Sequence, residues 1–347
     1  MKTFRKTLSL LLTLIICFGT FSFASGASEI KTEGAWTYMV ENGNATIYFC
    51  DNSITGDVTI PSKLGGYKVT TIGEGTFNNR DSITSVTVPD CVTTIGKDAF
   101  KASTLTSVKL GKGVTSIGAS AFAFCTKLKS LTIPNNVKTI GDSAFSGCTS
   151  LTKLTIGSGV TTMGINVFRD CINLKELTVS EGIKTIGNGA FFDCDSLTSV
   201  SLPDSVTDIA DYAFTGCNEL IAVTFGKNLK TIGFSAFSGC SKLTDIYFKG
   251  TTNQWNAVTI GNSNTALSGA KVHIMGDPII PIIPGTPSNP DTPENPDGSD
   301  DSNPSGCDCK CHSKGLKKFL FKIILFFQKI FRKNQSCSCG ALHYIIL

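Results

Sequence analysis

A repeat of 23 residues runs through most of this 347-residue chain and constrains its fold more than any other feature. A fixed period of about 20 to 50 residues indicates stacked units, because one unit of that length cannot bury its own apolar residues. The repeat is marked by eight phenylalanines, spaced 23 residues apart except for one interval of 22: Phe77, Phe100, Phe122, Phe145, Phe168, Phe191, Phe214 and Phe237.

Two more apolar positions recur with the phenylalanine, and they define the unit. Five residues before it comes an isoleucine or methionine, from Ile72 to Ile232, and eight before it comes valine, isoleucine or leucine. After it, apolar residues alternate as in a strand, for example at Leu128, Leu131 and Ile133. We therefore predict a solenoid with a β-strand plus a short helix or turn per 23-residue coil. Eight or nine coils with strands about 4.8 Å apart would form a rod about 40 Å long.

The unit Ile140–Leu151, which reads Ile-Gly-Asp-Ser-Ala-Phe-Ser-Gly-Cys-Thr-Ser-Leu, resembles the BspA-type leucine-rich repeat family. The resemblance spans roughly residues 30–275; Val58–Val69 looks like that family's N-terminal coil, and Gln254–Ile274 like its terminal cap. Ala210 departs from the family's usual glycine. The resemblance implies a leucine-rich repeat solenoid with capping coils over residues 28–276, in a secreted or surface-exposed bacterial protein. Some members of the family are adhesins.

The first 27 residues read as a signal peptide. Lys2, Arg5 and Lys6 form a positive start, an apolar stretch from Thr7 to Phe23 follows, and small residues at Ala24 and Ala27 suit cleavage. We therefore predict that the protein is exported, and that it is extracellular or on the cell surface.

Residues 277–306 read as a linker. They hold six acidic residues and no basic one, with prolines recurring throughout, so they favour an extended, disordered spacer without a core.

Residues 307–347 form a separate small module rich in cysteine and histidine. Seven soft ligands stand within 37 residues: Cys307, Cys309, Cys311, His312, Cys337, Cys339 and His343. Four of them would suffice for tetrahedral Zn²⁺. The tight Cys-x-Cys spacing leaves disulfides or unpaired thiols as alternatives.

A basic amphipathic helix is expected at residues 317–333, between the two ligand clusters. Its polar side carries six lysine or arginine residues, a pattern that favours peripheral contact with an anionic membrane through this C-terminal helix. Packing on the module itself or on a partner helix is the alternative. The membrane-facing side would comprise Phe319, Leu320, Ile323, Ile324, Phe326, Phe327, Ile330 and Phe331.

Six further cysteines recur three residues after consecutive repeat phenylalanines. We predict that they are buried, unpaired thiols, because parallel side chains in stacked coils seldom reach disulfide geometry. They are Cys125, Cys148, Cys171, Cys194, Cys217 and Cys240.

Exposed positions of the coil offer two candidate surfaces. The outward strand position is mostly threonine, from Thr87 to Tyr247, which suits strands and gives little binding energy. Five apolar residues instead break the repeat at positions that are normally small or polar, and an exposed cluster of them would suggest a contact patch. Packing against the adjacent coil is the alternative. They are Phe124, Ile165, Phe192, Tyr212 and Phe234, and Tyr212 and Phe234 come from neighbouring coils.

These features favour a non-enzymatic binding or adhesion protein with the solenoid as its recognition module for an unidentified protein or cell-surface ligand. The tail would be a retention module. A structural envelope or spacer protein without a dedicated ligand is the alternative. Charged residues make up 17% of the chain and the net charge is only +4, which argues against a nucleic-acid partner. We find no motif for a nucleophile or phosphate loop, and His273 in the cap is expected to be structural.

Overall fold

The computed structural model describes residues 29–277. The proposed signal peptide, the linker beyond Asp277 and the Cys/His module with its amphipathic helix lie outside the described residues.

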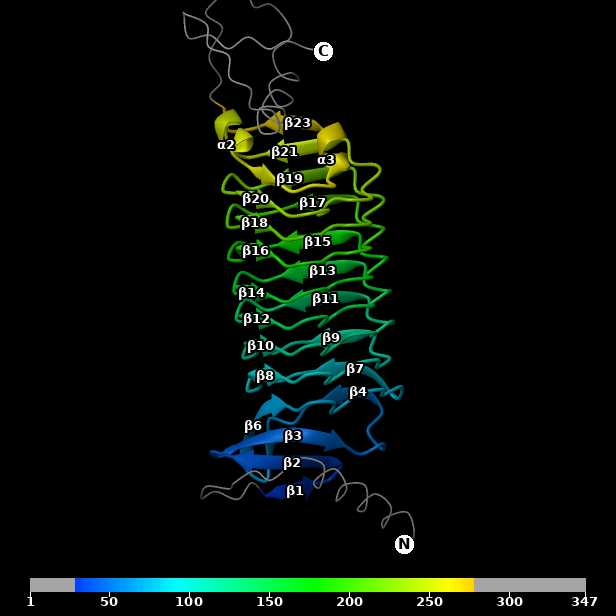
Figure 1. Cartoon of the computed structure of the whole chain (residues 1–347). Helices are drawn as coiled ribbons and strands as arrows, with labels where there is room; N and C mark the ends of the chain where they lie inside the picture. The colour runs from blue at the N-terminus through cyan, green and yellow to red at the C-terminus, as the bar shows by residue number, and fades with distance from the viewer. Residues whose placement is uncertain (1–28, 278–347) are drawn as a thin grey trace, which may run out of the picture. The chain divides into compact units, whose positions relative to one another are not determined.

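The described residues form a stack of coils closed at both ends (Figure 1). At the N-terminal end, strands β1 (Ile30–Glu33), β2 (Trp36–Glu41) and β3 (Asn44–Cys50) form an antiparallel meander. An Asn42-Gly43 pair joins β2 to β3, and both residues have positive φ, as a two-residue hairpin loop requires. β3 then pairs in parallel with β6 (Tyr67–Ile72), so the meander covers the first coil. β5 (Lys63–Leu64) pairs with β6 on the other side.

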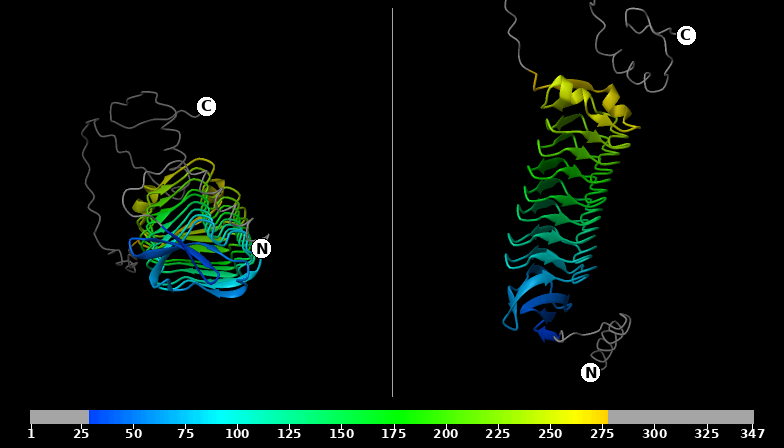
Figure 2. Two further views of the ribbon diagram at one scale, coloured as in Figure 1. Left: turned by 90° about the horizontal axis from the view of Figure 1, so that it is seen from below. Right: turned by 60° about the vertical axis from the view of Figure 1, so that its left-hand side comes forward.

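Each coil contributes one long strand, and these strands form one side of the stack (Figures 1 and 2). Neighbouring strands are parallel and in register, so Leu131, Leu154 and Leu177 lie side by side. The long strands are β4 (Gly56–Thr59), β7 (Ile83–Thr87), β9 (Ser107–Lys109), β11 (Ser130–Ile133), β13 (Lys153–Ile156), β15 (Glu176–Val179), β17 (Ser199–Ser201), β19 (Ala222–Phe225), β21 (Asp245–Phe248) and β23 (Lys271–Ile274).

In the eight coils between the first and the last, a second strand of two residues follows the long strand after a corner turn such as Pro134-Asn135-Asn136. The short strands are β8 (Thr94–Ile95), β10 (Ser116–Ile117), β12 (Thr139–Ile140), β14 (Thr162–Met163), β16 (Thr185–Ile186), β18 (Asp208–Ile209), β20 (Thr231–Ile232) and β22 (Thr259–Ile260). They are also parallel and in register.

The Ser/Ala/Phe segment that closes each coil is a turn in the described residues, not a helix. We call it the phenylalanine turn. Backbone N–H groups of one turn donate to carbonyls of the next, as from Phe145 to Val167 at 2.9 Å, so the turns stack by hydrogen bonds as the strands do. The sequence left open whether this segment is a short helix or a turn, and the structure shows a turn.

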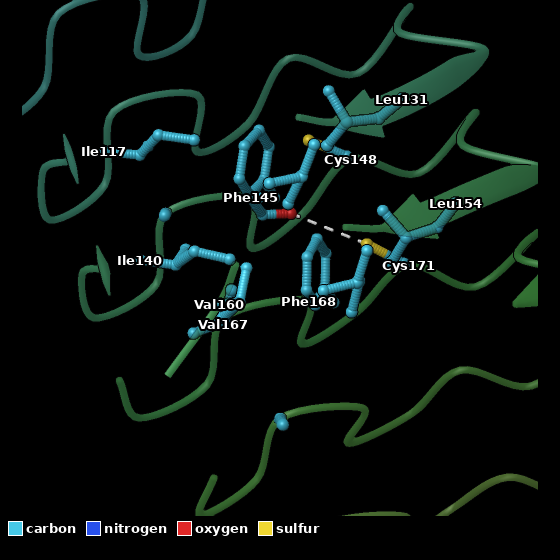
Figure 3. Close-up of a cluster of buried hydrophobic side chains, with 14 of the residues drawn as sticks. Ile117, Leu131, Ile140, Phe145, Cys148, Leu154, Val160, Val167, Phe168 and Cys171 are labelled. Carbon is cyan, nitrogen blue, oxygen red and sulfur yellow. Dashed lines mark hydrogen bonds between the residues drawn. The ribbon is translucent and has the colours of Figure 1, made fainter. Parts of the chain in front are cut away.

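The predicted core is confirmed. All eight repeat phenylalanines are fully buried. Their rings stack in one column with centroids 4.8–5.5 Å apart. The isoleucine column is buried as well, with only Met163 partly exposed. Figure 3 shows two successive layers, with Phe145 above Phe168 and the strand leucines Leu131 and Leu154 beside them.

The six repeat cysteines are buried and unpaired, as predicted. Each thiol contacts the carbonyl oxygen of the phenylalanine in the preceding coil, as between Cys171 and Phe145 at 3.5 Å (Figure 3). Burial raises the pKa of Cys125 to about 11 and that of Cys171 to about 12. These are structural thiols.

The C-terminal end is capped by two short helices, α2 (Thr252–Asn256) and α3 (Thr265–Gly269). Thr251 and Gln254 form a capping box that holds the start of α2. Trp255 of α2 is buried against Phe225 and Phe248, which covers the open end of the core. With the coils of β4 and β23 included, the stack has ten long strands, more than the eight or nine coils we predicted. Each capping coil adds a parallel strand to the long strands at its own end, β4 beside β7 and β23 beside β21.

Candidate binding surface

The exposed face of the long strands is polar, as the sequence predicted. Thr132, Thr155 and Thr178 stand side by side on successive strands. Next to them Lys153 and Glu176 form an ion pair at 2.7 Å. Surface pairs and threonines of this kind contribute little binding energy.

His273 lies at the end of this face and is bound to the preceding strand. Its Nε2 is 2.7 Å from Asp245 Oδ1, and its ring stacks on Tyr247 at 4.7 Å. The hydrogen bond from His273 lowers the pKa of Asp245. The sequence did not reveal this partnership, which joins β21 to β23. A structural role for His273 fits the contact.

The phenylalanine turns carry the predicted apolar residues, and most are exposed. Phe124 is 52% exposed, Ile165 51%, Phe234 42% and Tyr212 38%. Phe192 is only partly exposed. Ile165, Phe192, Tyr212 and Phe234 come from four consecutive coils, one from each. This surface lies on the same side of the stack as α3 (Figure 1).

Tyr212 and Phe234 are in contact. Their ring centroids are 5.5 Å apart with an interplanar angle of 79°, the edge-to-face geometry that aromatic pairs favour. Among the described residues, the ring of Phe124 and the ring of Phe192 do not contact this pair. The five candidates therefore include one aromatic pair, Tyr212 and Phe234.

The backbone of the turn explains why these side chains project. Tyr212 and Phe124 have φ of +59°, in the left-handed region. At the position of Tyr212 the other coils place serine, glycine, asparagine or aspartate, and at that of Phe124 they place glycine, aspartate, asparagine or alanine. The left-handed conformation costs a non-glycine residue roughly 1–3 kcal/mol. Asp211 of the preceding coil accepts the backbone N–H of Phe234 at 2.7 Å, and Asp142 accepts that of Ile165 at 2.8 Å. Neighbouring coils therefore hold the exposed residues in place.

Two of the candidates pack partly on the adjacent coil. The Phe124 ring covers Gly147, where an added Cβ would lie 2.6 Å from a ring carbon. The guanidinium of Arg169 lies 4.2 Å from the centroid of the Phe192 ring, a cation–π contact. Phe192 is therefore less available than the sequence suggested.

The structure adds exposed apolar residues that the repeat analysis did not single out. Ile172 and Ile221 project from the coils, and Tyr48 and Phe49 from the N-terminal meander. Comparison with equivalent repeat positions would have found the two isoleucines. The meander has no repeat to depart from.

Among residues 29–277, no three histidine, cysteine, aspartate or glutamate side chains are grouped so as to hold a metal ion. Over the same residues, none of the helices combines the length and apolarity that crossing a bilayer needs. The seven predicted metal ligands and the eight predicted membrane-facing residues lie outside this part of the chain.

Stacked in-register strands, a continuous core and closed ends define the described residues as a leucine-rich repeat solenoid. The family model for the BspA-type leucine-rich repeat region matches residues 46–175 and 161–268, in six copies. The chain belongs to the BspA-type leucine-rich repeat family.

Solved structures include several similar proteins. A leucine-rich repeat protein from Bacteroides ovatus is 26% identical with a TM-score of 0.53, covering 74% of this chain and 72% of its own. The leucine-rich repeat protein of T. pallidum is 24% identical with a TM-score of 0.49, covering 72% and 99%. A leucine-rich cell surface protein from Faecalibacterium prausnitzii is 22% identical with a TM-score of 0.31, covering 68% and 99%. No curated protein matches the chain.

Proposed function

We propose that this chain is a secreted or cell-surface, non-enzymatic binding protein that recognises a protein or surface ligand through its solenoid. The observation that carries the proposal is the Tyr212–Phe234 pair. An aromatic ring stands at a backbone position that disfavours it, and both rings remain more than one-third exposed. Aromatic side chains held this way supply large contact area at little further cost in conformational entropy.

A spacer without a ligand has no use for such a pair. Another coil has serine, Ser143, at the position of Tyr212, so the strained backbone there does not need a bulky side chain. Another coil has asparagine, Asn188, at the position of Phe234, which gives the same turn without exposed apolar area. The aromatic residues thus lower solubility and, at Tyr212, stability. Recognition explains why they are there.

The proposal assigns no catalytic role to the solenoid. The one histidine among residues 29–277, His273, is occupied by Asp245 and Tyr247, and no serine, threonine or cysteine hydrogen-bonds to it there. The repeat thiols are buried with raised pKa values and do not present thiolates.

The test replaces the pair with the residues of other coils, Tyr212→Ser with Phe234→Asn. Mature protein is screened against immobilised matrix proteins, bacterial cells and glycan arrays, and the affinity for any ligand found is compared between variants. We expect a loss of about tenfold or more, since truncating two aromatic contacts removes well over 1.4 kcal/mol.

The matched control is Ile172→Thr with Ile221→Thr, which removes two exposed apolar residues elsewhere on the solenoid. An equal loss in both double variants would mean that the ligand does not use the pair. If the mature protein binds none of these targets, the spacer function replaces the proposal.

The tail completes the proposal as a retention module. Residues 307–347 combine seven zinc-type ligands with a basic amphipathic segment, which supports peripheral membrane contact and a zinc-bound or disulfide-closed knot. The experiment is co-sedimentation of the mature chain with vesicles with and without anionic lipid, beside metal analysis. A chain ending at residue 306 is the control. Equal indifference to both vesicles contradicts the membrane contact, and intact disulfides without metal contradict zinc.

A further inference from the structure

A basic hollow lies on the opposite side of the solenoid from the phenylalanine turns, beside the cap helix α2. It has a volume of about 370 Å³ and lies among the corner turns of three successive coils, with α2 forming one wall. Its lining includes Lys184, Thr207, Lys227, Lys230, Gln254 and Ala257. All of its charged residues are lysines.

Two of the three lysines of the hollow have no carboxylate within ion-pair distance among the described residues. Among residues 29–277 neither Lys184 nor Lys230 forms an ion pair, and Lys227 alone reaches a carboxylate, Asp204, at 3.7 Å. Gln254 uses its side-chain oxygen to accept the N–H of Thr251, which leaves its amide NH₂ group as a further donor. The hollow therefore offers several donors to one anionic group.

The nearby carboxylates are already occupied by internal hydrogen bonds. Glu181 accepts the backbone N–H groups of Asp204 and Ser205 at 3.1 and 2.8 Å. Asp208 accepts the hydroxyls of Thr207 and Thr231 at 2.6 and 2.5 Å, and these bonds lower its pKa. These hydrogen bonds hold the two carboxylates in place but leave their charge, and Asp208 also interacts electrostatically with Lys230.

A regular column of lysine and threonine leads away from the hollow along the corner turns. It comprises Lys138, Thr161, Lys184, Thr207 and Lys230 at intervals of 23 residues. Backbone hydrogen bonds join Thr161 to Lys138, Thr207 to Lys184 and Lys230 to Thr207 at 2.7–3.0 Å. Because coils repeat at about 4.8 Å, the three lysines recur at about 10 Å. Exposed ammonium groups thus alternate with hydroxyls along a straight line.

We propose that the basic hollow and this lysine column bind a linear acidic polysaccharide whose carboxylate or sulfate groups recur at a similar interval. Hydroxyl-rich surface and evenly spaced cations suit a charged sugar chain. The column carries no aromatic residue on which a nucleic-acid base would stack, and no apolar residue for a membrane. Several weak contacts along one chain add up through multivalency. This site is distinct from the Tyr212–Phe234 pair.

Binding is measured by titration calorimetry of the full mature chain with polygalacturonate and with dextran sulfate. Neutral dextran, inorganic sulfate and single-stranded DNA serve as comparisons. We expect both acidic polysaccharides to bind and to weaken with salt. Inorganic sulfate at the same charge concentration should not displace them, because a free ion gains nothing from the column. Displacement by sulfate would show a site for the free anion, and equal binding of DNA would show attraction to any polyanion. Either result overturns the proposal.

The decisive variant is Lys184→Gln with Lys230→Gln, for which we expect about tenfold weaker binding from the loss of two charge-assisted contacts. A second variant, Ala257→Glu, keeps every lysine and places a carboxylate in the hollow, and it should also weaken binding. Ala257 is exposed, so the added carboxylate is not buried.

The matched control is Lys129→Gln with Lys175→Gln. These lysines are also two coils apart and alternate with a threonine, but they do not line the hollow. We expect less than about a twofold change, since exposed charges remote from the ligand contribute little. An equal loss in both double variants would contradict a specific site at the hollow.

Discussion

At the scale of single residues, the solenoid separates two uses of aromatic side chains. Repeat phenylalanines such as Phe145 lie inside the coil, stacked on their neighbours and excluded from solvent. Tyr212 and Phe234 lie only a few residues before Phe214 and Phe237 in the same turns, yet they face outward. The same turn thus stabilises the rod with one aromatic residue and presents another. Variation at the second position changes the surface without disturbing the core.

The inner column should be the main source of stability for each coil. The ring of Phe168 lies 5.4 Å from Phe145 and 5.5 Å from Phe191. Replacing Phe168→Ala removes both stacks and leaves a cavity, so we expect a loss of about 3–5 kcal/mol in the free energy of unfolding, measured in urea. Thr178→Ala on the exposed strand face is the control. A loss below about 1 kcal/mol for Phe168→Ala would contradict a continuous core.

The buried thiols predict a dependence of stability on pH. Burial raises the pKa of Cys171 to about 12, above the 9.0 of an unperturbed thiol. Below pH 9 both folded and unfolded chains keep the proton and stability is constant; above it only the unfolded chain loses protons. Each thiol therefore lowers stability by up to about 1.4 kcal/mol per pH unit, until pH passes the folded pKa.

Cys171→Ser tests this dependence, because Ser103 naturally fills the equivalent buried position in an earlier coil. The variant should lose less stability between pH 8 and pH 10.5 than the parent, under reducing conditions. Iodoacetamide should label the six thiols only after denaturation, with no reductant needed. Equal pH slopes, or labelling of the folded protein, would contradict the assignment.

At the scale of the element, the sequence allowed the coil to be predicted but not its corners. Alternation at Leu131 and Ile133 indicated the long strand, and the period aligned it with its neighbours. The short strand was not separable from an apolar run, because two residues such as Thr139 and Ile140 are too few to show periodicity. Whether the phenylalanine turn was helical depended on hydrogen bonds to the next coil, which no single unit contains.

The candidate surfaces could also be predicted only in part. Departures from the repeat identified Tyr212 and Phe234, since a repeat makes an unusual residue visible. The hollow beside α2 was not predictable, because its wall is built by a cap helix outside the repeat. The role of Arg80 was not predictable either, because its partners lie in the N-terminal loop outside the repeat. Arg80 occupies the position of the repeat cysteines, yet donates to carbonyls of the N-terminal loop, including Cys50 at 3.2 Å and Asp51 at 2.8 Å.

The corner turn makes a prediction about spacing between coils. A Cβ on Gly159 would lie 1.8 Å from the carbonyl oxygen of Asn135 in the preceding coil. Gly159→Ala should therefore push the two turns apart and cost about 1–3 kcal/mol in thermal or urea unfolding. Gly269→Ala in α3 is the control, since no atom lies within 4 Å of its added Cβ. Equal stability of both variants would mean that the corner turns do not set the coil spacing.

At the scale of the whole molecule, the solenoid is a one-dimensional stack. Each coil contacts mainly the coil before and the coil after, and the meander and Trp255 close the two ends. Stability in such a stack is a sum over coils and their interfaces. An end coil opens by losing one interface, whereas an internal coil loses two. We therefore expect a destabilising substitution in an end coil to unfold mainly that coil and its nearest neighbours.

Trp255→Ala tests this by removing the buried ring that covers Phe225 and Phe248. We expect hydrogen exchange, followed by mass spectrometry of peptides, to accelerate strongly in β19, β21 and β23 and progressively less toward the N-terminus. Strands β11 and β13 should exchange as in the parent. Phe168→Ala, in the middle of the stack, is the matched comparison and should lower protection on both sides of its coil. If Trp255→Ala instead raised exchange uniformly from β4 to β23, the solenoid would unfold as one cooperative unit, and its coils would be coupled well beyond nearest neighbours.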